Sequence, residues 1–310
     1  MSAQNQVRNR GHISDSFDPA DKPYYYDGPP IDQARFNGII NLWDKKEDYL
    51  RPIYNQSSTN SCVANATAAA VRFLVHALIN KQGHDESLHS VEDPSRLFIY
   101  YLGRAYGVME KEQAPWEWPV SLRDTGCRIR NAFKSAHAYG IASEKKWPWY
   151  EEAGVVIGLN DRPVDAAFVG NKLVNGIEYC RLDPDHTADA EKLMGPEEKA
   201  SVGAITLFRL RQCLYEGYPV VFGFKFYWPT FPATHKSLTD EFPSLGPLPT
   251  WAWQPAWGSH AVLAVGYDHT KQRVLIQNSW GDGTNGHAHF WMPYDWIKSF
   301  EATEDFWMVR

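Results

Sequence analysis

The chain of 310 residues carries a formal net charge of −6, with 44% hydrophobic and 22% charged residues. This length and composition are typical of a folded protein with one large domain or two lobes. The acidic balance lacks the basic surface that nucleic-acid binding uses, so nucleic acid is not expected as a partner. No apolar run approaches the ~20 residues of a membrane span, and no membrane partner is expected.

The N-terminus and the cysteines bear on where the protein works. The first 22 residues include basic side chains but no apolar stretch, so no Sec-type signal peptide is expected. We therefore expect the protein to stay in the cytoplasm or to leave by a non-Sec route. The four cysteines contain no C-x-x-C pair, which predicts mostly free thiols, one of them reactive, and neither a metal nor a cofactor.

Residues 1–45 differ in composition from the rest of the chain. Three successive tyrosines at 24–26 and the turn-forming Gly28-Pro29-Pro30 favour extended backbone over helix. We expect an extended arm whose aromatic side chains pack against the body of the protein.

The first part of the body is predicted to be mainly helical. An alanine-rich run begins at Cys62 and contains no glycine or proline before Gly83. Further helices are expected at about 94–106 and 127–139, the latter closed by Gly140. Residues 151–200 are polar and loop-like, with a short helix near 189–194.

The second part is predicted to be mostly β. A helix over 207–216 precedes strand patterns at 219–226, 260–267, 273–277 and 287–292, and a proline- and tryptophan-rich insertion lies at 228–257. The sequence thus predicts an α+β fold with the arm at 1–45, a helical lobe at 46–200 and a β lobe at 201–310. Ligand sites are common between such lobes.

Cys62 is the first candidate for chemistry. A cysteine in the first turn of a helix lies near unpaired backbone N–H groups, which stabilise the thiolate that attacks carbonyl groups. The polar segment that begins at Gln56 could direct donors at a developing oxyanion. Taken alone, this pattern is more typical of a small buried cysteine on an alanine-rich helix.

His260 begins a predicted strand, and Asn278 directly follows another. His260 comes after a Gly-Ser turn, so its backbone is fixed while its ring can face a cleft, although a structural histidine is at least as common there. Asn278 could accept the imidazole N–H with its amide oxygen, and Trp280 could cover that bond. The plain alternative for Asn278 is a role in turn formation.

Together, in the order Gln56, Cys62, His260 and Asn278, these segments resemble the papain family of cysteine peptidases. In that family a glutamine lies six residues before the nucleophile, as it does here. The family's H-A-V-x-x-V-G-Y strand matches the eight residues that start at His260, and its N-S-W-G motif starts at Asn278. The resemblance extends to residues 126–148, where A-Y-G-I leads to W-P-W-Y.

The resemblance implies a papain-like fold of two lobes with the active site in the cleft between them. Cys62 and His260 would form a thiolate–imidazolium pair, with Asn278 orienting the ring and Trp280 shielding it. The side-chain amide of Gln56 and the backbone N–H of Cys62 would form the oxyanion hole.

The resemblance also implies that backbone groups of Gly126, Cys127 and Ser259 hold the substrate in extended form. Two departures accompany it: Val63 follows the nucleophile where the family has tryptophan, and Thr59 stands where many members have a disulfide cysteine. The catalytic cysteine and histidine are 198 positions apart, whereas ~130–150 is usual. These differences leave the substrate preference open.

Two other patterns are expected to be structural. His287-x-His289 places two imidazoles on one face of a strand, but no carboxylate or cysteine cluster adjoins them. An ordinary surface strand is therefore expected instead of a metal site. The basic residues from Arg123 to Lys134 are expected to form a solvated helix face.

The expected function is hydrolysis of peptide or protein substrates through a thioester acyl-enzyme. Residues 1–45 are expected either to occupy the cleft as an inhibitory pro-segment or to buttress a lobe. The alternatives are a catalytically inactive binding protein on the same fold, and an acyltransferase or amidase with the same Cys-His-Asn residues.

Overall fold

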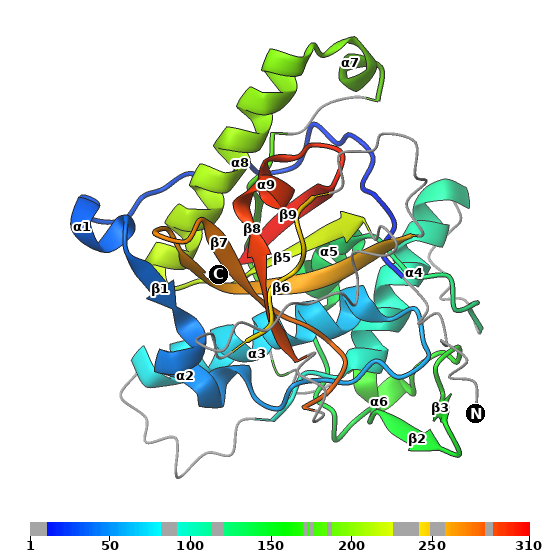
Figure 1. The fold of residues 1–310 in the computed structure, drawn as a ribbon. Helices are drawn as coiled ribbons and strands as arrows, with labels where there is room; N and C mark the ends of the chain where they lie inside the picture. The colour runs from blue at the N-terminus through cyan, green and yellow to red at the C-terminus, as the bar shows by residue number, and fades with distance from the viewer. Residues whose placement is uncertain are drawn as a thin grey trace, which may run out of the picture.

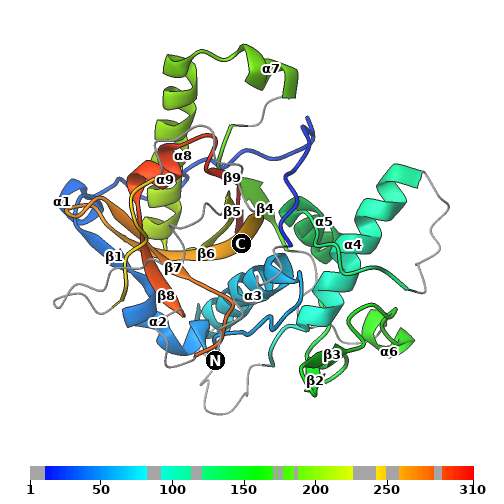
Figure 2. The same cartoon turned by 45° about the vertical axis from the view of Figure 1, so that its right-hand side comes forward.

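The structure, a computed structural model, combines a group of helices with an antiparallel sheet (Figure 1). A second view separates the two parts more clearly, with the helix α3 between the other helices and the sheet (Figure 2). The described residues are 11–81, 92–112, 121–169, 173, 177–184, 188–225, 242–248, 258–282 and 288–310.

The helical group is organised around α3, which packs against α4, α5 and the strand β6. The alanine-rich first half of α3 is buried throughout, because small side chains fill the narrow space between the other helices and the sheet. Helix α5 ends at Gly140, whose positive φ of 67° favours glycine. The bounds are α3 Cys62–Lys81, α4 Arg96–Glu112, α5 Ile129–Tyr139, α6 Asp165–Phe168, β2 Tyr150–Glu152 and β3 Val155–Ile157.

Within the described residues, seven strands form the main sheet and all of their pairings are antiparallel. Strand β6 is a central strand of this sheet. Its residues 259–264 pair with β5, and its residues 266–268 pair with β1. Gly266 permits the second pairing, since a Cβ there would lie 2.5 Å from the Ile40 carbonyl oxygen. The order is β4 (Tyr179–Arg181), β9 (Thr303–Val309), β5 (Val220–Lys225), β6 (Ser259–Asp268), β7 (Arg273–Gln277) and β8 (His289–Pro293), with β1 (Ile39–Asn41) beside β6.

The long helix α8 packs against β5, β6 and β9. It starts with Pro196, which suits the first turn of a helix, and it ends at Gly217 in the left-handed conformation with φ 97°. Its start lies eleven residues before the predicted one. The remaining helices are α1 Gln33–Phe36, α2 Leu42–Leu50, α7 Ala188–Leu193 and α9 Tyr294–Lys298.

The N-terminal arm is extended only in part. Residues 33–36 form a helical turn and residues 39–41 join the sheet as β1, in contrast to the extended backbone that the sequence predicts for the whole of 1–45. The expected lobe boundary at residue 200 stays a prediction. Strand β4, which precedes that boundary, pairs with β9 in the sheet.

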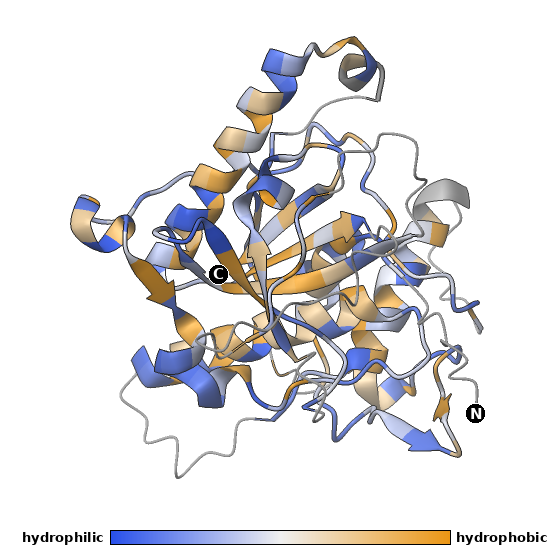
Figure 3. Ribbon diagram, viewed as in Figure 1, coloured by the Kyte–Doolittle hydropathy of each residue, from blue (hydrophilic) through white to orange (hydrophobic). Residues whose placement is uncertain are grey.

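One continuous core joins the helices to the sheet, and its apolar strands and helix faces meet at the centre of the molecule (Figure 3). Among the described residues, α3 is long and apolar enough to span a membrane, which the sequence reading did not anticipate. However, 78% of its most apolar window is buried inside the protein. This burial is the usual property of a central core helix.

Candidate active site

Cys62 is the first residue of α3, and its side chain meets the start of β6. The backbone N–H of Ala261 donates to the Cys62 sulfur over 3.4 Å, so the thiol lies beside the residue that follows His260. The turn before α3 is fixed locally: the Asn65 side chain donates to the Ser61 carbonyl over 2.9 Å. The predicted cysteine and histidine segments are therefore in contact, although they belong to a helix and a distant strand.

The Cys62 thiol is completely buried, and this burial raises its pKa. Backbone N–H groups of Ala261, Gly11 and Val63 act in the opposite direction, as expected at a helix start, but they do not outweigh the loss of solvent. The sequence-based expectation of a thiolate favoured by the helix terminus is thus wrong for this form of the chain, because the sulfur is covered.

His260 is held by Asn278 and lies among aromatic rings. Its Nε2 is 2.8 Å from Asn278 Oδ1, and this oxygen also accepts the N–H of Ser279 over 2.8 Å. The centroid of the Trp280 ring is 5.5 Å from that of the imidazole, while Phe224 approaches from β5 at 5.8 Å. The predicted shielding position of Trp280 beside the His–Asn bond agrees with this geometry.

Gln56 is buried and connected to the same segment. Its side-chain N–H donates to the Thr59 carbonyl over 2.8 Å, and its Oε1 accepts a hydrogen bond from Ser279 Oγ over 2.7 Å. Its backbone N–H donates to the Ser279 carbonyl over 2.9 Å. These three bonds fix the amide beside the start of α3 and next to Asn278.

Gly126, Cys127 and Ser259 line the two walls beside the sulfur, and the N-terminal arm lies between them. The N–H of Cys127 donates to the Gly11 carbonyl over 2.9 Å, and its carbonyl accepts the N–H of Ile13 over 3.1 Å. On the other wall, the Ser259 carbonyl accepts the N–H of the arm's next residue, 12, over 3.4 Å. The structure thus brings all eight sequence-predicted site residues together around the start of α3 and the start of β6.

The comparisons with known proteins concern the sequence and fold of the whole chain. No family model matches the chain. Its sequence is 26% identical over 324 residues to an uncharacterized peptidase C1-like protein of Acanthamoeba polyphaga mimivirus, covering 100% of this chain and 89% of that protein. Its structure is similar to that of xylellain, a cysteine protease from Xylella fastidiosa, with a TM-score of 0.66, 28% identity and coverage of 98% and 96%. The chain resembles the papain-like cysteine peptidases in both sequence and fold.

The papain-like α+β fold expected from the motifs is also confirmed. A digestive procathepsin L 3 from the larval midgut of Tenebrio molitor has the same fold, with a TM-score of 0.54, 18% identity and coverage of 96% of this chain and 75% of that one. The four cysteines are free thiols, in agreement with the prediction of mostly free thiols, and all four are buried.

The N-terminal arm passes directly over Cys62. A Cβ on Gly11 would lie 1.5 Å from the Asn60 carbonyl oxygen, and a Cβ on Gly126 would lie 2.0 Å from the Gly11 carbonyl oxygen. Only glycine at these two positions permits the backbones to approach so closely. The contact explains why Cys62 is covered.

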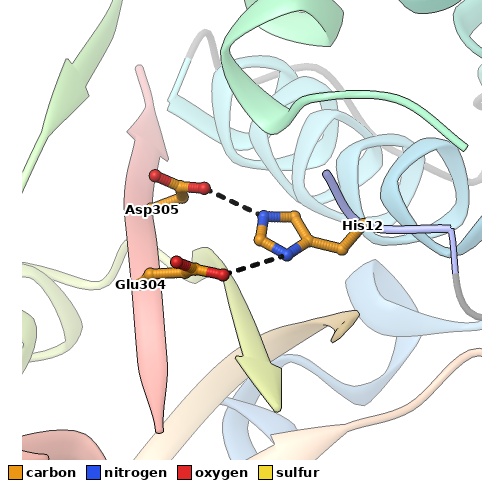
Figure 4. A group of neighbouring side chains, drawn as sticks. All are labelled: His12, Glu304 and Asp305. Carbon is orange, nitrogen blue, oxygen red and sulfur yellow. Dashed lines mark hydrogen bonds and ion pairs between the residues drawn. The ribbon is translucent and has the colours of Figure 1, made fainter. Parts of the chain in front are cut away.

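His12 is a site residue that the sequence reading missed. Its imidazole Nε2 lies 3.0 Å from Asp305 Oδ2 (Figure 4). The other ring nitrogen, Nδ1, lies 2.6 Å from Ser259 Oγ. Burial alone would lower the pKa of His12, but the hydrogen bond and charge of Asp305, together with Glu304 and Asp15, raise it above 6.5. No local pattern could have revealed this pairing, because His12 and Asp305 are 293 positions apart.

The side chains of His12, Glu304 and Asp305 have the composition of a metal site. Each could offer one ligand atom, and these atoms lie within 4.8 Å of one another. The hydrogen bond to Asp305 and the raised pKa of His12 instead indicate an imidazolium held by carboxylates. A protonated ring nitrogen has no lone pair for a metal ion.

Further along the arm, acidic residues contact basic residues of α5. Asp21 pairs with Arg130 at 2.6 Å, and both side chains are only 4% exposed. Asp18 pairs with Lys134 at 2.5 Å in a more exposed position. The predicted solvated basic face of this helix is therefore wrong for these residues, because the arm covers them.

The histidine pair of the last predicted strand also differs from its interpretation. His287 lies outside the described residues. His289 belongs to β8 and is buried between the rings of Trp43, at 4.2 Å, and Phe242, at 5.0 Å. Burial lowers its pKa to about 3. It is a neutral core histidine, and the expectation of a surface strand is wrong at this position.

Proposed function

We propose that the protein hydrolyses peptide bonds with Cys62 as nucleophile and His260 as base and acid. The Cys62 sulfur attacks the carbonyl carbon while its proton passes to His260, and the imidazolium then protonates the departing amine. Water, deprotonated by His260, attacks the thioester and releases the acid. The observation that carries this proposal is the meeting of α3 and β6, with Ala261 N–H on the Cys62 sulfur and Asn278 on the neighbouring ring.

Asn278 is proposed to set the orientation of the imidazole. Since Nε2 of His260 lies 2.8 Å from Asn278 Oδ1, Nδ1 is the nitrogen assigned to proton exchange with the sulfur. Trp280 would limit the access of water to that hydrogen bond, because its ring lies over the imidazole.

Gln56 and the backbone N–H of Cys62 are proposed as the donors to the tetrahedral oxyanion. Gln56 suits this role because Thr59 and Ser279 fix both ends of its amide before substrate arrives. Pre-oriented donors in a buried site stabilise developing negative charge strongly, and loss of one donor typically costs ~10²–10³ in turnover.

The acyl side of the substrate is proposed to lie along Gly126, Cys127 and Ser259. Support comes from the arm, whose residues 11–13 already use backbone groups of Cys127 and Ser259 as hydrogen-bond partners. An extended peptide in the same place would meet the same donors and acceptors.

We also propose that the arm is an intramolecular inhibitor. Residues 11–13 occupy the space beside the proposed nucleophile. Gly11 directs its backbone N–H to the sulfur, so the arm presents no carbonyl carbon for the sulfur to attack. The competing role, a buttress for one lobe, is less suited to a segment that contacts both walls of the cleft.

The test uses the full chain with Gly11→Ala, which is designed to displace the arm. In this background Cys62→Ala should abolish hydrolysis of a fluorogenic peptide, while the matched control Cys180→Ala should retain it. Undiminished hydrolysis by the Cys62→Ala variant would exclude the proposed nucleophile. Peptide mapping after iodoacetamide treatment should find Cys62 alkylated first. An inert Cys62 in the folded Gly11→Ala protein would favour a binding protein, and net transfer to an added amine would favour an acyltransferase.

A further inference from the structure

Asp124 lies in the loop before α5 and binds the turn that precedes Cys62. Both oxygens of its carboxylate accept the backbone N–H of Asn60, over 3.1 Å and 3.2 Å. Its backbone carbonyl accepts the side-chain amide of Asn60 over 2.7 Å. The turn is thus held through both the backbone and the side chain of Asn60, close to the proposed nucleophile in the sequence.

The same carboxylate is connected to the wall at Gly126 through Tyr100 of α4. The Tyr100 hydroxyl donates to Asp124 Oδ1 and accepts the backbone N–H of Gly126 over 3.0 Å. Tyr100 is completely buried, so water does not compete for these bonds. Hydrogen bonds therefore run from Asn60 through Asp124 and Tyr100 to Gly126, and they join the turn before α3 to the wall beside the Cys62 sulfur.

Arg104 fixes Tyr100 in this position. Its guanidinium carbon lies 3.7 Å from the centroid of the Tyr100 ring, and its Nε donates to the Tyr100 carbonyl over 3.1 Å. The same guanidinium donates to the carbonyl of Arg123, the residue before Asp124, over 2.8 Å. Burial raises the pKa of Tyr100, so its hydroxyl keeps the proton that it donates to the carboxylate.

The turn has hydrogen bonds of its own that do not extend to this wall. The Thr59 hydroxyl donates to the Gln56 carbonyl over 2.6 Å and lies 2.6 Å from Ser61 Oγ. Thr59 stands where many papain-family members have a disulfide cysteine, and all four cysteines of this chain are free. No disulfide therefore joins the turn to the wall, and Asp124 with Tyr100 makes the connection by hydrogen bonds.

We propose that Asp124, acting with Tyr100, is a positioning residue that sets the distance between the proposed oxyanion donors and the wall for the acyl side of the substrate. The assignment rests on the proposed peptidase function. One end of the connection lies in the turn between Gln56 and Cys62, and the other end directly precedes Cys127. An extended substrate has to contact both places at once, and a misplacement of about 1 Å can cost ~10²-fold in rate.

The first test compares two p-nitrophenyl esters with the same leaving group, one with a single acyl residue and one with a longer acyl peptide. All variants are made in the full chain carrying Gly11→Ala. Asp124→Ala should lower kcat/KM for the longer ester by about 10- to 100-fold and for the short ester by less than about threefold, because only the longer ester reaches Cys127. The control Asp161→Ala changes an exposed aspartate and should affect neither value.

Two milder variants grade the effect on the ratio of the two kcat/KM values. Asp124→Asn retains an oxygen for the donors that share Oδ1, so it should lower the ratio by only about three- to fivefold. Tyr100→Phe removes the hydroxyl but keeps the ring beside Arg104, and it should lower the ratio by about tenfold. The double variant Tyr100→Phe, Asp124→Ala should lose no more than Asp124→Ala alone, because both changes break one connection. Additive losses would contradict that connection.

Alkylation of Cys62 by iodoacetamide distinguishes positioning from a general loosening of the site. The reagent requires only the reactive thiol, so its rate should stay within about twofold in every variant. Unchanged hydrolysis of the longer ester by the Asp124→Ala protein, or an equal loss with both esters, overturns the positioning role while the peptidase function stands. If the Gly11→Ala parent cleaves neither ester and Cys62 resists alkylation, the proposed function fails and the positioning role fails with it. Tyr100→Phe keeps the test decisive should Asp124→Ala fold poorly, because it removes a single oxygen atom.

Discussion

Two stretches within the first 45 residues differ in how they are attached to the protein. Residues 11–21 lie in the cleft and are held by hydrogen bonds and buried charges, including the pairs of His12 with Asp305 and Asp21 with Arg130. Residues 33–41 are instead part of the body. Phe36 is 3% exposed, and β1 pairs with β6.

The difference predicts where the proposed inhibitory segment ends and the body of the protein begins. Polar and charged contacts can be exchanged for water or for a substrate, whereas an apolar core residue and a sheet strand cannot leave without exposing apolar surface. Tyr24 is already body-like, since it is 2% exposed and its N–H donates to the Arg181 carbonyl over 2.7 Å. A detachable segment therefore ends before about residue 23, well short of residue 45.

The largest effect should come from Phe36. Its ring makes edge contacts with the rings of Phe208, Tyr215 and Tyr267. Phe36→Ala should lower the free energy of unfolding by about 3–5 kcal/mol, because it leaves a cavity in the core. Urea denaturation measures the change, with Tyr25→Ala, a residue 70% exposed, as a control within about 0.5 kcal/mol. A small effect at Phe36 would mean that residues 33–41 are as detachable as the cleft segment.

The next effect concerns activity. Gly11→Ala should raise kcat/KM of the full chain by at least about tenfold, because the methyl group would overlap the Asn60 carbonyl oxygen and shift the arm toward the open state. The control is Gly195→Ala, where a Cβ meets nothing within 4 Å. Unchanged activity in a folded Gly11→Ala protein would show that residues 11–21 do not restrict the site.

A smaller effect is expected from the charges that hold the arm on α5. Arg130→Gln leaves Asp21 buried without its 2.6 Å partner and should weaken arm docking by about 3 kcal/mol. Lys134→Gln affects a more exposed pair and should weaken docking by less than about 1 kcal/mol. The measurement is the activity of each full-chain variant, with the activity of the Gly11→Ala protein taken as the value for a fully displaced arm. The Arg130→Gln variant should be the more active of the two. The reverse order would indicate that burial of the Asp21 pair is not what secures the segment.

The smallest effect is on pH dependence. Docking of the arm raises the pKa of His12, through Asp305, and the pKa of Asp15, through burial. The docked arm therefore binds more protons than the free arm, so docking weakens as the pH rises. For His12 this weakening begins above about 6.5. The lowered pKa values of Asp18, beside Lys134, and of Asp305 act in the opposite sense and matter only as the pH falls toward 4. Glu304, Arg130 and Arg181 also face this cluster.

The measurement is the activity of the full chain divided by that of the Gly11→Ala variant at each pH, which cancels the titration of the catalytic pair. The ratio should rise several-fold between pH 6 and 8, and His12→Gln should flatten much of the rise. A ratio that falls over this range would contradict the assigned protonation of His12.

The sequence was sufficient to locate the residues proposed for catalysis. Gln56, Cys62, His260 and Asn278 lie in short contiguous motifs whose order is retained, and the structure brings them together. Helix ends were also predictable where a local signal exists, as at Gly140 and Gly217, because a positive φ favours glycine.

The sequence could not reveal contacts between distant segments. Strand β9 was not predicted, although it supplies Glu304 and Asp305. Its two consecutive acids are followed by consecutive apolar residues, so it lacks the polar–apolar alternation of a strand, and its pairing with β5 and β4 joins distant segments. Arg130 was expected on a solvated helix face, but it is buried beside Asp21 of the arm and the Trp307 ring, two segments that are distant in the sequence. The upward shift of the Cys62 pKa likewise depends on burial by the arm, whose residue Gly11 is distant in the sequence.

The backbone N–H of Gly11 donates to the Cys62 sulfur, while its carbonyl oxygen accepts the N–H of Cys127 over 2.9 Å. In this state the sulfur faces a backbone N–H and not a carbonyl carbon, so a molecule is poorly placed to cleave its own arm. Shedding of the arm would then need a collision between two copies, one of them already uncovered. The onset of activity should be second order in protein, with a lag that shortens on concentration or on seeding with a trace of uncovered enzyme.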